Sequence, residues 1–405
     1  MNSSVEHLKW LEYQYVTMKS KLLRWASINS GSYHSAGLSD LCQKLQGDMV
    51  DLPGKARVFQ GGPIVHMDQH GELQKHPGSP IIIHEYRQPG TPCLALGGHL
   101  DTVYPPHSSF QDVSAIDDFR WRGPGVADMK GGLLVLLYGL RAFLRSPYRD
   151  KLSWKIIINS DEEVGSLGSM PVIEAQLADV QLGLLFEPAL DEKGTLARAR
   201  KGSGKFLIQA IGTEAHAGRE FAKGRNAVVA LTKIVQQVHR LNGQRPGVTL
   251  NLGLFHGGVA ANQVPGKACC QIDVRYRCNE DCSWILDQLQ DLVKQANQDP
   301  NFEFQLIGTC HRPVKTISQA GQNLYQEMKQ CAEQLRLQLP WQDTGGCCDG
   351  NNWAHFGIPC LDSLGVRGGN IHSEGEFIIL PSLLERAQLL ALFLMRLAAG
   401  EINLP

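Results

Sequence analysis

Residues 92–101 read PCLALGGHLD, an apolar run that begins after a proline, passes through a glycine pair and ends at His99 and Asp101. A short apolar run bounded in this way is typical of a strand buried in a parallel sheet. The same plan recurs twice, in WKIIINS at 154–160 before Glu162 and Glu163 and in LGLLF at 182–186 before Glu187. Open α/β sheets bind ligands just outside the carboxyl ends of their strands. We therefore expect these polar side chains to gather at one edge of one sheet.

The bulk composition is that of an ordinary globular protein with room for two domains. The chain has 405 residues, of which 43% are hydrophobic and 20% are charged, and single hydrophobic cores stop growing at roughly 250–300 residues. The formal net charge is −1, and no basic cluster with interleaved aromatic residues occurs. We expect neither a nucleic-acid partner nor an anionic membrane as a partner.

The first 32 residues favour an amphipathic helix over a targeting segment. Their apolar residues recur at helical spacing, at Leu8, Leu11, Tyr15, Met18 and Leu22. There is no uninterrupted apolar segment with a cleavage signature, and no 18-residue apolar run that could span a membrane. We expect a cytoplasmic protein, unless a leader has been removed.

The 11 cysteines are odd in number and scattered, with adjacent pairs at 269–270 and 347–348. Adjacent cysteines rarely bridge each other because disulfide geometry is demanding. A secreted disulfide framework would be denser and even-numbered. The pattern favours reduced, buried thiols.

The chain from about residue 55 to 200 alternates strand-like and helix-like stretches. This alternation predicts an α/β fold with a mainly parallel sheet and helices on both faces. The expected strands are RVFQ (57–60), IVHM (64–67), IIIHEYR (81–87), CLALGG (93–98), IIIN (156–159) and GLLF (183–186), with a buried helix over 131–146. A late strand at 358–365 and a closing helix at 380–400 return to the same pattern.

A second pattern occupies the middle of the chain. Residues 202–313 predict strand, helix, two strands, helix and strand, which is the order of a ferredoxin-like α+β unit. We therefore expect a catalytic domain in two parts, residues 1–201 and 314–405, with an inserted ferredoxin-like domain at 202–313.

His99 and Asp101 lie two residues apart, so in extended backbone they project to the same side. Asp101 could then accept the free imidazole N–H of His99 and fix its tautomer. A lone His-x-Asp is weak evidence, because such residues mostly lie on surfaces. His66 has the same spacing to the aspartate at position 68 but lies in a polar stretch, and we expect His66 at the surface.

Asp128 lies between GPGVA and a helix that begins with a glycine pair. An acid at this place could simply favour the helix dipole. The flanking glycines also allow close approach of backbone, which suits a carboxylate that bridges two cations.

Glu162 and Glu163 are adjacent and cannot both face the same way at a strand end. One could bind a metal while the other acts on substrate as a general base. The alternative is a solvated acidic turn, and Glu187 and His372 each have a similar surface alternative. Taken together, however, such acids at one sheet edge repel one another unless cations neutralise them.

The ordered motifs resemble those of one known family. They are HLDTVYP (99–105), GPGVADMKGG (123–132), DEEVGSLGS (161–169), LFEP (185–188), GTEAHAG (212–218), ANQVP (261–265), IDVRY (272–276) and the loop around His372. The set resembles the two-zinc metallopeptidases that include glutamate carboxypeptidase, aminoacylase, acetylornithine deacetylase and succinyl-diaminopimelate desuccinylase. The resemblance covers roughly residues 95–375, and the motif sequences most resemble those of bacterial glutamate carboxypeptidase.

This resemblance implies a dinuclear site. One zinc would be held by His99, Asp128 and Glu187, and the other by Asp128, Glu163 and His372. Glu162 would be the general base, and Asp101 would orient His99. It also implies a cis peptide between Asp128 and Met129. Ligands of this kind suit zinc, and also cobalt or manganese.

The resemblance also implies residues that act outside the metal ligands. His216 would reach the active site of a partner subunit in a homodimer formed through the inserted domain. Asn262 and Arg275 would help to hold the substrate, and Arg312 would be a further carboxylate clamp. The sequence differs from the carboxypeptidase motifs at RARKGSG (198–204), TGGCCDG (344–350) and VRGG (366–369). We expect these segments to determine substrate specificity.

The sequence thus predicts a metal-dependent hydrolase of a peptide or amide bond, acting on a small peptide or N-acyl amino acid. Deacetylase, desuccinylase or aminopeptidase specificity on the same site is an alternative. A metal- and peptide-binding homologue without turnover is another, but no expected ligand and no expected base is missing.

Overall fold

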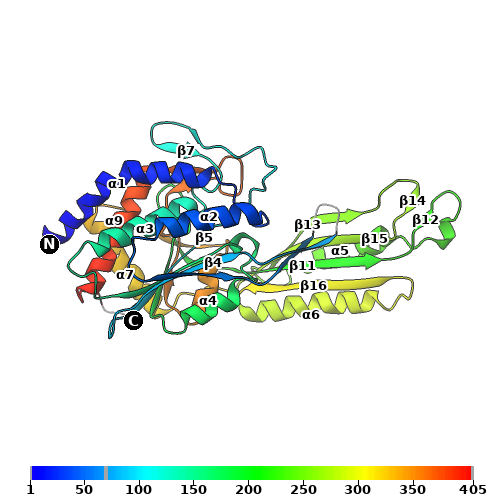
Figure 1. The fold of residues 1–405 in the computed structure, drawn as a ribbon. Helices are drawn as coiled ribbons and strands as arrows, with labels where there is room; N and C mark the ends of the chain where they lie inside the picture. The colour runs from blue at the N-terminus through cyan, green and yellow to red at the C-terminus, as the bar shows by residue number, and fades with distance from the viewer. Residues whose placement is uncertain (1, 68–71, 403–405) are drawn as a thin grey trace.

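A computed structural model describes residues 2–67 and 72–402 (Figure 1). Its main sheet has six strands in the order β1-β4-β8-β5-β9-β18. β5 (Cys93–His99) lies at the centre, parallel to both β8 (Ser153–Asn159) and β9 (Leu182–Leu185). β18 (Cys360–Leu361) extends the parallel part, whereas β4 (Pro80–Tyr86) is antiparallel to β8. The mainly parallel α/β sheet is confirmed, with β1 (Lys55–Gln60) at its outer edge.

Helices cover both faces of this sheet. The larger hydrophobic core packs one face against α1 (Asn2–Ala26), α2 (Ser35–Asp48), α3 (Lys130–Leu144), α7 (Gln319–Gln334) and α9 (Pro381–Ala398). A smaller core packs the other face against α4 (Met170–Leu177) and α8 (Asp349–His355). The fully buried β5 and β8 explain why both sequences read as continuous apolar runs rather than as alternating ones.

One expected strand of the main sheet lies elsewhere. β2 (Ile64–Met67) pairs with β3 (Leu73–His76) in a separate two-stranded hairpin. The preceding Gly61, Gly62 and Pro63 interrupt the strand pattern after β1, so the chain leaves the sheet there. The hairpin reaches the inserted segment, where Nζ of Lys267 lies 2.6 Å from a carboxylate oxygen of Glu72.

The middle of the chain forms a second sheet of four antiparallel strands, in the order β13-β15-β11-β16. Its sequence order is β11 (Gly202–Ile211), α5 (Ala227–Arg240), β13 (Thr249–Gly257), β15 (Lys267–Tyr276), α6 (Asn279–Ala296) and β16 (Glu303–Arg312). Both helices pack on one face of this sheet through their own hydrophobic core. This is the expected strand-helix-strand-strand-helix-strand order, and the segment projects away from the main sheet (Figure 1).

Short elements complete the connections. They are β6 (Ser114–Ala115), β7 (Arg120–Arg122), η1 (Glu162–Val164), β10 (Leu196–Arg200), β12 (Ala215–His216), η2 (Phe221–Lys223), β14 (Gln263–Val264), β17 (Trp341–Thr344), β19 (Gly368–Gly369) and β20 (Phe377–Ile379). Within the described segments, no helix is both long enough and apolar enough to cross a membrane. All 11 cysteines lie within the described residues, and none of them is bridged in a disulfide.

Candidate active site

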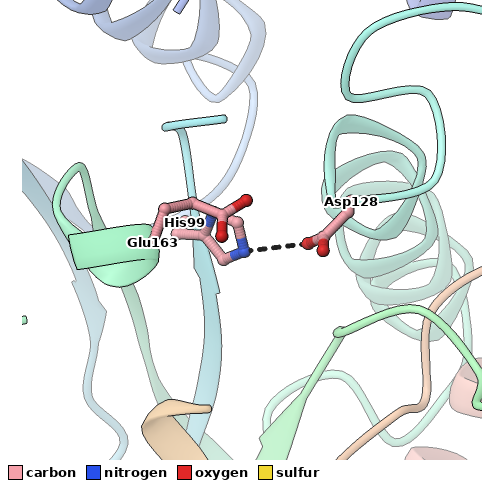
Figure 2. A group of neighbouring side chains, drawn as sticks. All are labelled: His99, Asp128 and Glu163. Atoms are coloured by element: carbon pink, nitrogen blue, oxygen red, sulfur yellow. Dashed lines mark ion pairs between the residues drawn. The ribbon is translucent and has the colours of Figure 1, made fainter. Parts of the chain in front are cut away.

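The carboxyl ends of three parallel strands bring the sequence-predicted ligands together. His99 is the last residue of β5 and pairs in register with Asn159 at the end of β8. Glu162 and Glu163 follow β8 in the turn η1, and Glu187 follows β9 by two residues. Figure 2 shows His99 and Glu163 from this edge of the sheet facing Asp128, which precedes α3.

Asp128 lies at the centre of two groups of side chains. Its Oδ1 is 3.2 Å from Nε2 of His99, which in turn lies 3.7 Å from Oε2 of Glu187. Its Oδ2 is 3.4 Å from Nε2 of His372, which lies 3.1 Å from Oε2 of Glu163. One carboxylate thus faces a different set of partners with each oxygen.

The backbone around Asp128 allows this approach. The Asp128–Met129 peptide is cis, as expected from the resemblance. A Cβ on Gly132, in the first turn of α3, would lie only 1.9 Å from the carbonyl oxygen of Phe186. Glycine at this position therefore lets the start of α3 lie directly against the chain that leads to Glu187.

The chemistry of this cluster fits divalent cations. Nε2 of His99 and Oδ1 of Asp128 are buried without a hydrogen-bond partner, although buried polar atoms are normally paired. Ligand atoms of His99, Asp128 and Glu163 lie within 4.8 Å of one another. Burial, and then the charge of Asp128, raises the pKa of Glu163 to about 7. A bound cation would relieve both the unpaired atoms and the repulsion between the acids.

Asp101 supports the cluster from behind, in a way that goes beyond the expected contact with His99. Nδ1 of His99 lies 3.0 Å from the backbone carbonyl of Asp101 and 3.4 Å from its carboxylate. The Asp101 carboxylate also accepts the backbone N–H groups of Glu162 and Glu163, each at 3.1 Å. Ser32 donates a further hydrogen bond of 2.8 Å. Asp101 therefore ties the end of β5 to the turn that carries both glutamates.

Glu376 is a supporting residue that we did not predict. Its buried carboxylate accepts the backbone N–H groups of Gly125, Ala127 and Asp128 at 2.9–3.1 Å. It thereby holds the loop that presents Asp128. The sequence signal that could have indicated Glu376 is its place four residues after His372 in HSEGE. Only the fold shows which backbone N–H groups its carboxylate accepts.

Arg312 lies against Glu162. It is 2% exposed, and its guanidinium donates to Oε1 of Glu162 at 2.8 Å, to Oγ of Ser166 at 2.9 Å, and to Asp349. Burial raises the pKa of Glu162 well above its usual range, although the charge of Arg312 acts in the opposite direction. Arg312 also lines a cavity that reaches Glu162 and Glu163. Its contact with a substrate carboxylate stays a prediction.

Arg275 reaches the same cavity from β15. Its guanidinium makes two hydrogen bonds to Asp273, at 2.8 and 3.0 Å, and one to Sγ of Cys347 at 3.2 Å. The cavity has a volume of about 560 Å³ and is lined by Glu162, Glu163 and His372 together with Lys205 and Arg275. A ligand here would meet both the acidic cluster and two cations of the four-stranded sheet.

His216 and Asn262 lie apart from this cavity. His216 belongs to β12, which pairs with β14 at the end of the projecting segment remote from β5 (Figure 1). Its side chain is exposed, and its Nδ1 accepts the backbone N–H of Gly218 at 3.1 Å. The backbone carbonyl of Asn262 accepts the N–H of Ala217. The chain thus keeps these two residues together but away from its own Asp128.

The chain is similar in sequence to known proteins. The model of Peptidase family M20/M25/M40 matches residues 95–396. Carboxypeptidase G2 of Pseudomonas sp. (strain RS-16) is 30% identical over 326 residues, which are 79% of this chain and 77% of that protein.

Two solved structures share the fold. An M20 family metallo-carboxypeptidase from Sulfolobus solfataricus superposes with a TM-score of 0.76 at 16% identity, covering 94% of this chain and 99% of that one. A Bacillus subtilis protein described as a dinuclear metal binding peptidase from the M20 family superposes with a TM-score of 0.63 at 14% identity, covering 98% and 100%. The family match covers most of the chain and includes the whole acidic cluster, so the chain belongs to the metal-dependent peptidase family M20/M25/M40 and is a hydrolase of that family.

Proposed function

We propose that the protein is a two-metal hydrolase that cleaves the amide bond of an N-acyl amino acid or small peptide with a free carboxylate, as a glutamate carboxypeptidase does. The observation that carries this proposal is the position of Asp128, with one oxygen toward His99 and the other toward His372. Such an arrangement suits one carboxylate shared by two cations.

The proposed ligands follow from these two groups. His99, Asp128 and Glu187 would hold one ion, and Asp128, Glu163 and His372 would hold the other. Imidazole and carboxylate ligands without thiolate suit zinc, with cobalt or manganese as alternatives. When bound, the ions supply a Lewis acid for the scissile carbonyl and lower the pKa of the attacking water.

Glu162 is the proposed general base. It lines the cavity beside the ligand Glu163 and belongs to neither group around Asp128. Its carboxylate would take the proton of the attacking water and pass it to the leaving amine. Asp101 would keep both glutamates in place through their backbone N–H groups.

The proposed substrate class rests on charge and on a relative. Lys205 and Arg275 line the same cavity as the acids, and cations at this place suit a substrate carboxylate. The similar protein from Pseudomonas is named a carboxypeptidase. The alternative is a deacetylase, desuccinylase or aminopeptidase specificity at the same two-metal site.

We further propose that residues 202–313 act as an inserted domain that dimerises the protein. His216 and Asn262 would then serve the active site of the partner subunit, where His216 would stabilise the oxyanion. The exposure of His216, at the remote end of this segment, supports that role.

A hydrolysis screen on metal-reconstituted protein tests the proposal. Zinc-loaded protein should contain two ions per chain, cleave N-acyl amino acids or peptides with a free carboxylate, and lose activity on chelation. Turnover only of peptides with a free amino terminus would favour the aminopeptidase alternative. A saturated protein with at most one ion per chain would reject the dinuclear site.

A further inference from the structure

A cavity of about 320 Å³, here called the arginine pocket, is separate from the catalytic cavity, and the two share no lining residue. Its walls come from the chain after α7, the first half of α9, the loop after β9 and the segment before β19. The charged side chains that line it are Lys193, Arg336, Arg367, Arg386, Glu192 and Glu385. Four cations thus accompany two acids, and the lining carries a net positive charge.

Arg386 is the most deeply buried of these cations, with an exposed fraction of 3%. Its Nη2 donates to the carbonyl oxygen of Gly194 at 2.7 Å, and its Nη1 is buried without a hydrogen-bond partner in the described structure. Burial lowers the pKa of Arg386 to about 10, an effect that the charge of Glu385 opposes and that of Arg367 reinforces. The guanidinium group is therefore still charged at neutral pH.

Two other buried arginines show what Arg386 lacks. Arg200 pairs with Asp362 at 2.6 Å. Arg312 pairs with Glu162 at 2.8 Å. Burial of a charge is costly unless an opposite charge pairs with it, yet no carboxylate among the described residues forms an ion pair with Arg386. The protein thus holds a buried positive charge without a counter-charge at the wall of the arginine pocket.

Arg367 lies close to Arg386 and also keeps a donor unused. A Cβ on Gly194 would lie 2.1 Å from Nη2 of Arg386 and 3.3 Å from Cδ of Arg367, so both side chains pack on this glycine. The terminal nitrogens of Arg367 donate to Glu385 and to the carbonyl oxygen of Glu192, each at 3.0 Å. Its Nε is buried and has no partner within the described residues. Two like charges therefore lie close together with a single paired carboxylate.

Arg336 brings a third guanidinium group from another element. α7 ends at Gln334, and Arg336 follows with a φ of 58°, in the left-handed region where glycine is usual after a helix. The side chain of Arg336 is exposed, and it makes no hydrogen bond or ion pair with any residue that the structure describes. It is therefore free to bind an anion that enters the arginine pocket.

The arginine pocket accounts for one of the segments in which the sequence differs from the carboxypeptidase motifs. Arg367 belongs to VRGG (366–369), where we expected a determinant of substrate specificity. Its side chain lines the arginine pocket and not the catalytic cavity. The same segment continues to the proposed ligand His372, and Glu192 follows the proposed ligand Glu187 by five residues. An anion in this pocket would therefore contact both segments that lead to these ligands without entering the catalytic cavity.

We propose that the arginine pocket binds a phosphate group, either as inorganic phosphate or as the phosphate of a small monoester. A guanidinium group donates two N–H groups in one plane, which matches the spacing of phosphate oxygens. Three such groups come from different elements, so a tetrahedral dianion with several acceptor oxygens fits them better than a carboxylate with two. The proposal goes beyond the proposed function and does not depend on it.

Isothermal titration calorimetry of the zinc-loaded full-length protein with inorganic phosphate tests the site. Phosphate is also a ligand for zinc, so binding at the metals is separated by variants that leave every proposed metal ligand unchanged. Arg336→Gln removes a donor at the exposed side of the pocket and should weaken phosphate binding there about tenfold, the scale of one hydrogen bond to a charged group. Arg386→Met should abolish phosphate binding in the pocket.

A variant with the opposite effect makes the test specific. Glu192→Gln removes an acid from the lining, so it should tighten phosphate binding in the pocket about threefold, the scale of an exposed charge interaction. Arg57→Gln is the matched control, because Arg57 is an exposed arginine of β1 that lines neither cavity, and it should bind phosphate like the wild type. Thermal melting without phosphate shows whether each variant is folded. Arg336→Gln and Glu192→Gln decide the test even if Arg386→Met does not fold.

Two comparisons decide the class of ligand. Glycerol 3-phosphate is titrated beside inorganic phosphate, and the tighter of the two shows whether the pocket prefers an ester or the free ion. Acetate binding that depends on Arg336 as strongly as phosphate binding does would overturn the assignment to a phosphate group. Phosphate binding that neither Arg336→Gln nor Glu192→Gln changes would overturn the site itself, because all of the bound phosphate would then lie at the metals.

Discussion

Arg312 donates a hydrogen bond of 2.8 Å to Oε1 of Glu162 and a second one to the carbonyl oxygen of the same residue at 3.1 Å. Its other terminal nitrogen donates to Asp349, which also accepts hydrogen bonds from Asn159 and Ser166. The proposed base is therefore held by a cation that is itself anchored on the far side. This arrangement suggests that Arg312 positions Glu162.

The first prediction is that Arg312→Lys lowers kcat more than it raises KM. An ammonium group keeps the charge but cannot donate in the same planar fork to Glu162 and Asp349. A displaced base can cost up to about 100-fold in rate. If Arg312 instead holds the substrate carboxylate, as the sequence resemblance implies, KM should rise with kcat nearly unchanged. Steady-state kinetics on protein of unchanged thermal stability separates the two roles.

The second prediction separates the base from the ligand. Glu162→Gln keeps the size of the side chain but cannot accept a proton, so kcat should fall on the order of 10²–10⁴-fold while both metals stay bound. Glu163→Gln should instead weaken metal binding. Metal analysis of the two variants decides the assignment, and the opposite pattern would mean that the two roles are reversed.

The third prediction concerns Glu376. Because its carboxylate accepts the N–H of Asp128 and of two residues before it, Glu376→Gln should loosen the loop that carries the shared ligand. Loss of a group that supports a ligand typically costs about 10–100-fold in metal affinity. Competition titration with a chelator measures this change. The exposed Glu374 is a matched control, and Glu374→Gln should bind metal like the wild type.

The fourth prediction tests the role of His216 between subunits. Variants His216→Ala and Glu162→Gln should each be nearly inactive as homodimers. In a hybrid dimer, one active site would combine Glu162 from the first chain with His216 from the second, so mixing with subunit exchange should restore activity. If His216 served its own chain, every site in the hybrid would carry one lesion and no activity would return. A fully active monomer at assay concentration would also exclude the role.

The fifth prediction concerns stability away from the metal ligands. Asp362 is fully buried and pairs with Arg200 at 2.6 Å and with Lys315. Asp362→Asn would leave both cations buried without their counter-charge, which should lower the free energy of unfolding by about 3–5 kcal/mol. Urea unfolding measures the loss. Asp343 pairs with the exposed Arg198, and Asp343→Asn should change stability little.

The ion pairs of Asp362 also predict that the stability of the protein depends on pH. Burial opposes ionisation of Asp362, but Arg200 and Lys315 outweigh it and hold the pKa of Asp362 below its usual range. A lowered carboxyl pKa contributes stability that is present at neutral pH and is lost as the pH falls below the ordinary range of aspartate. The stability difference between wild type and Asp362→Asn should therefore shrink in acid.

Much of the fold could be predicted from local pattern. Continuous apolar runs indicated β5, β8 and β9, helical periodicity indicated α1, and long apolar stretches indicated α3 and α9. The strand-helix order of the middle segment predicted its four-stranded sheet. These signals are local, because a strand buried on both faces leaves a continuous apolar run in its own sequence and an amphipathic helix leaves a helical period. Among the expected strands, β2 pairs with β3 and not with the main sheet, and the helices α2, α4, α7 and α8 were not expected from the sequence.

The sequence by itself determined which side chains meet at the edge of the main sheet. Once β5, β8 and β9 are parallel, His99, Glu162, Glu163 and Glu187 must follow their carboxyl ends. Only the tertiary structure decided what supports them: Glu376 behind Asp128, Asp101 beneath the two glutamates, and Arg312 against Glu162. These contacts join segments up to 251 residues apart. They depend on how whole elements pack, so the local sequence pattern does not predict them.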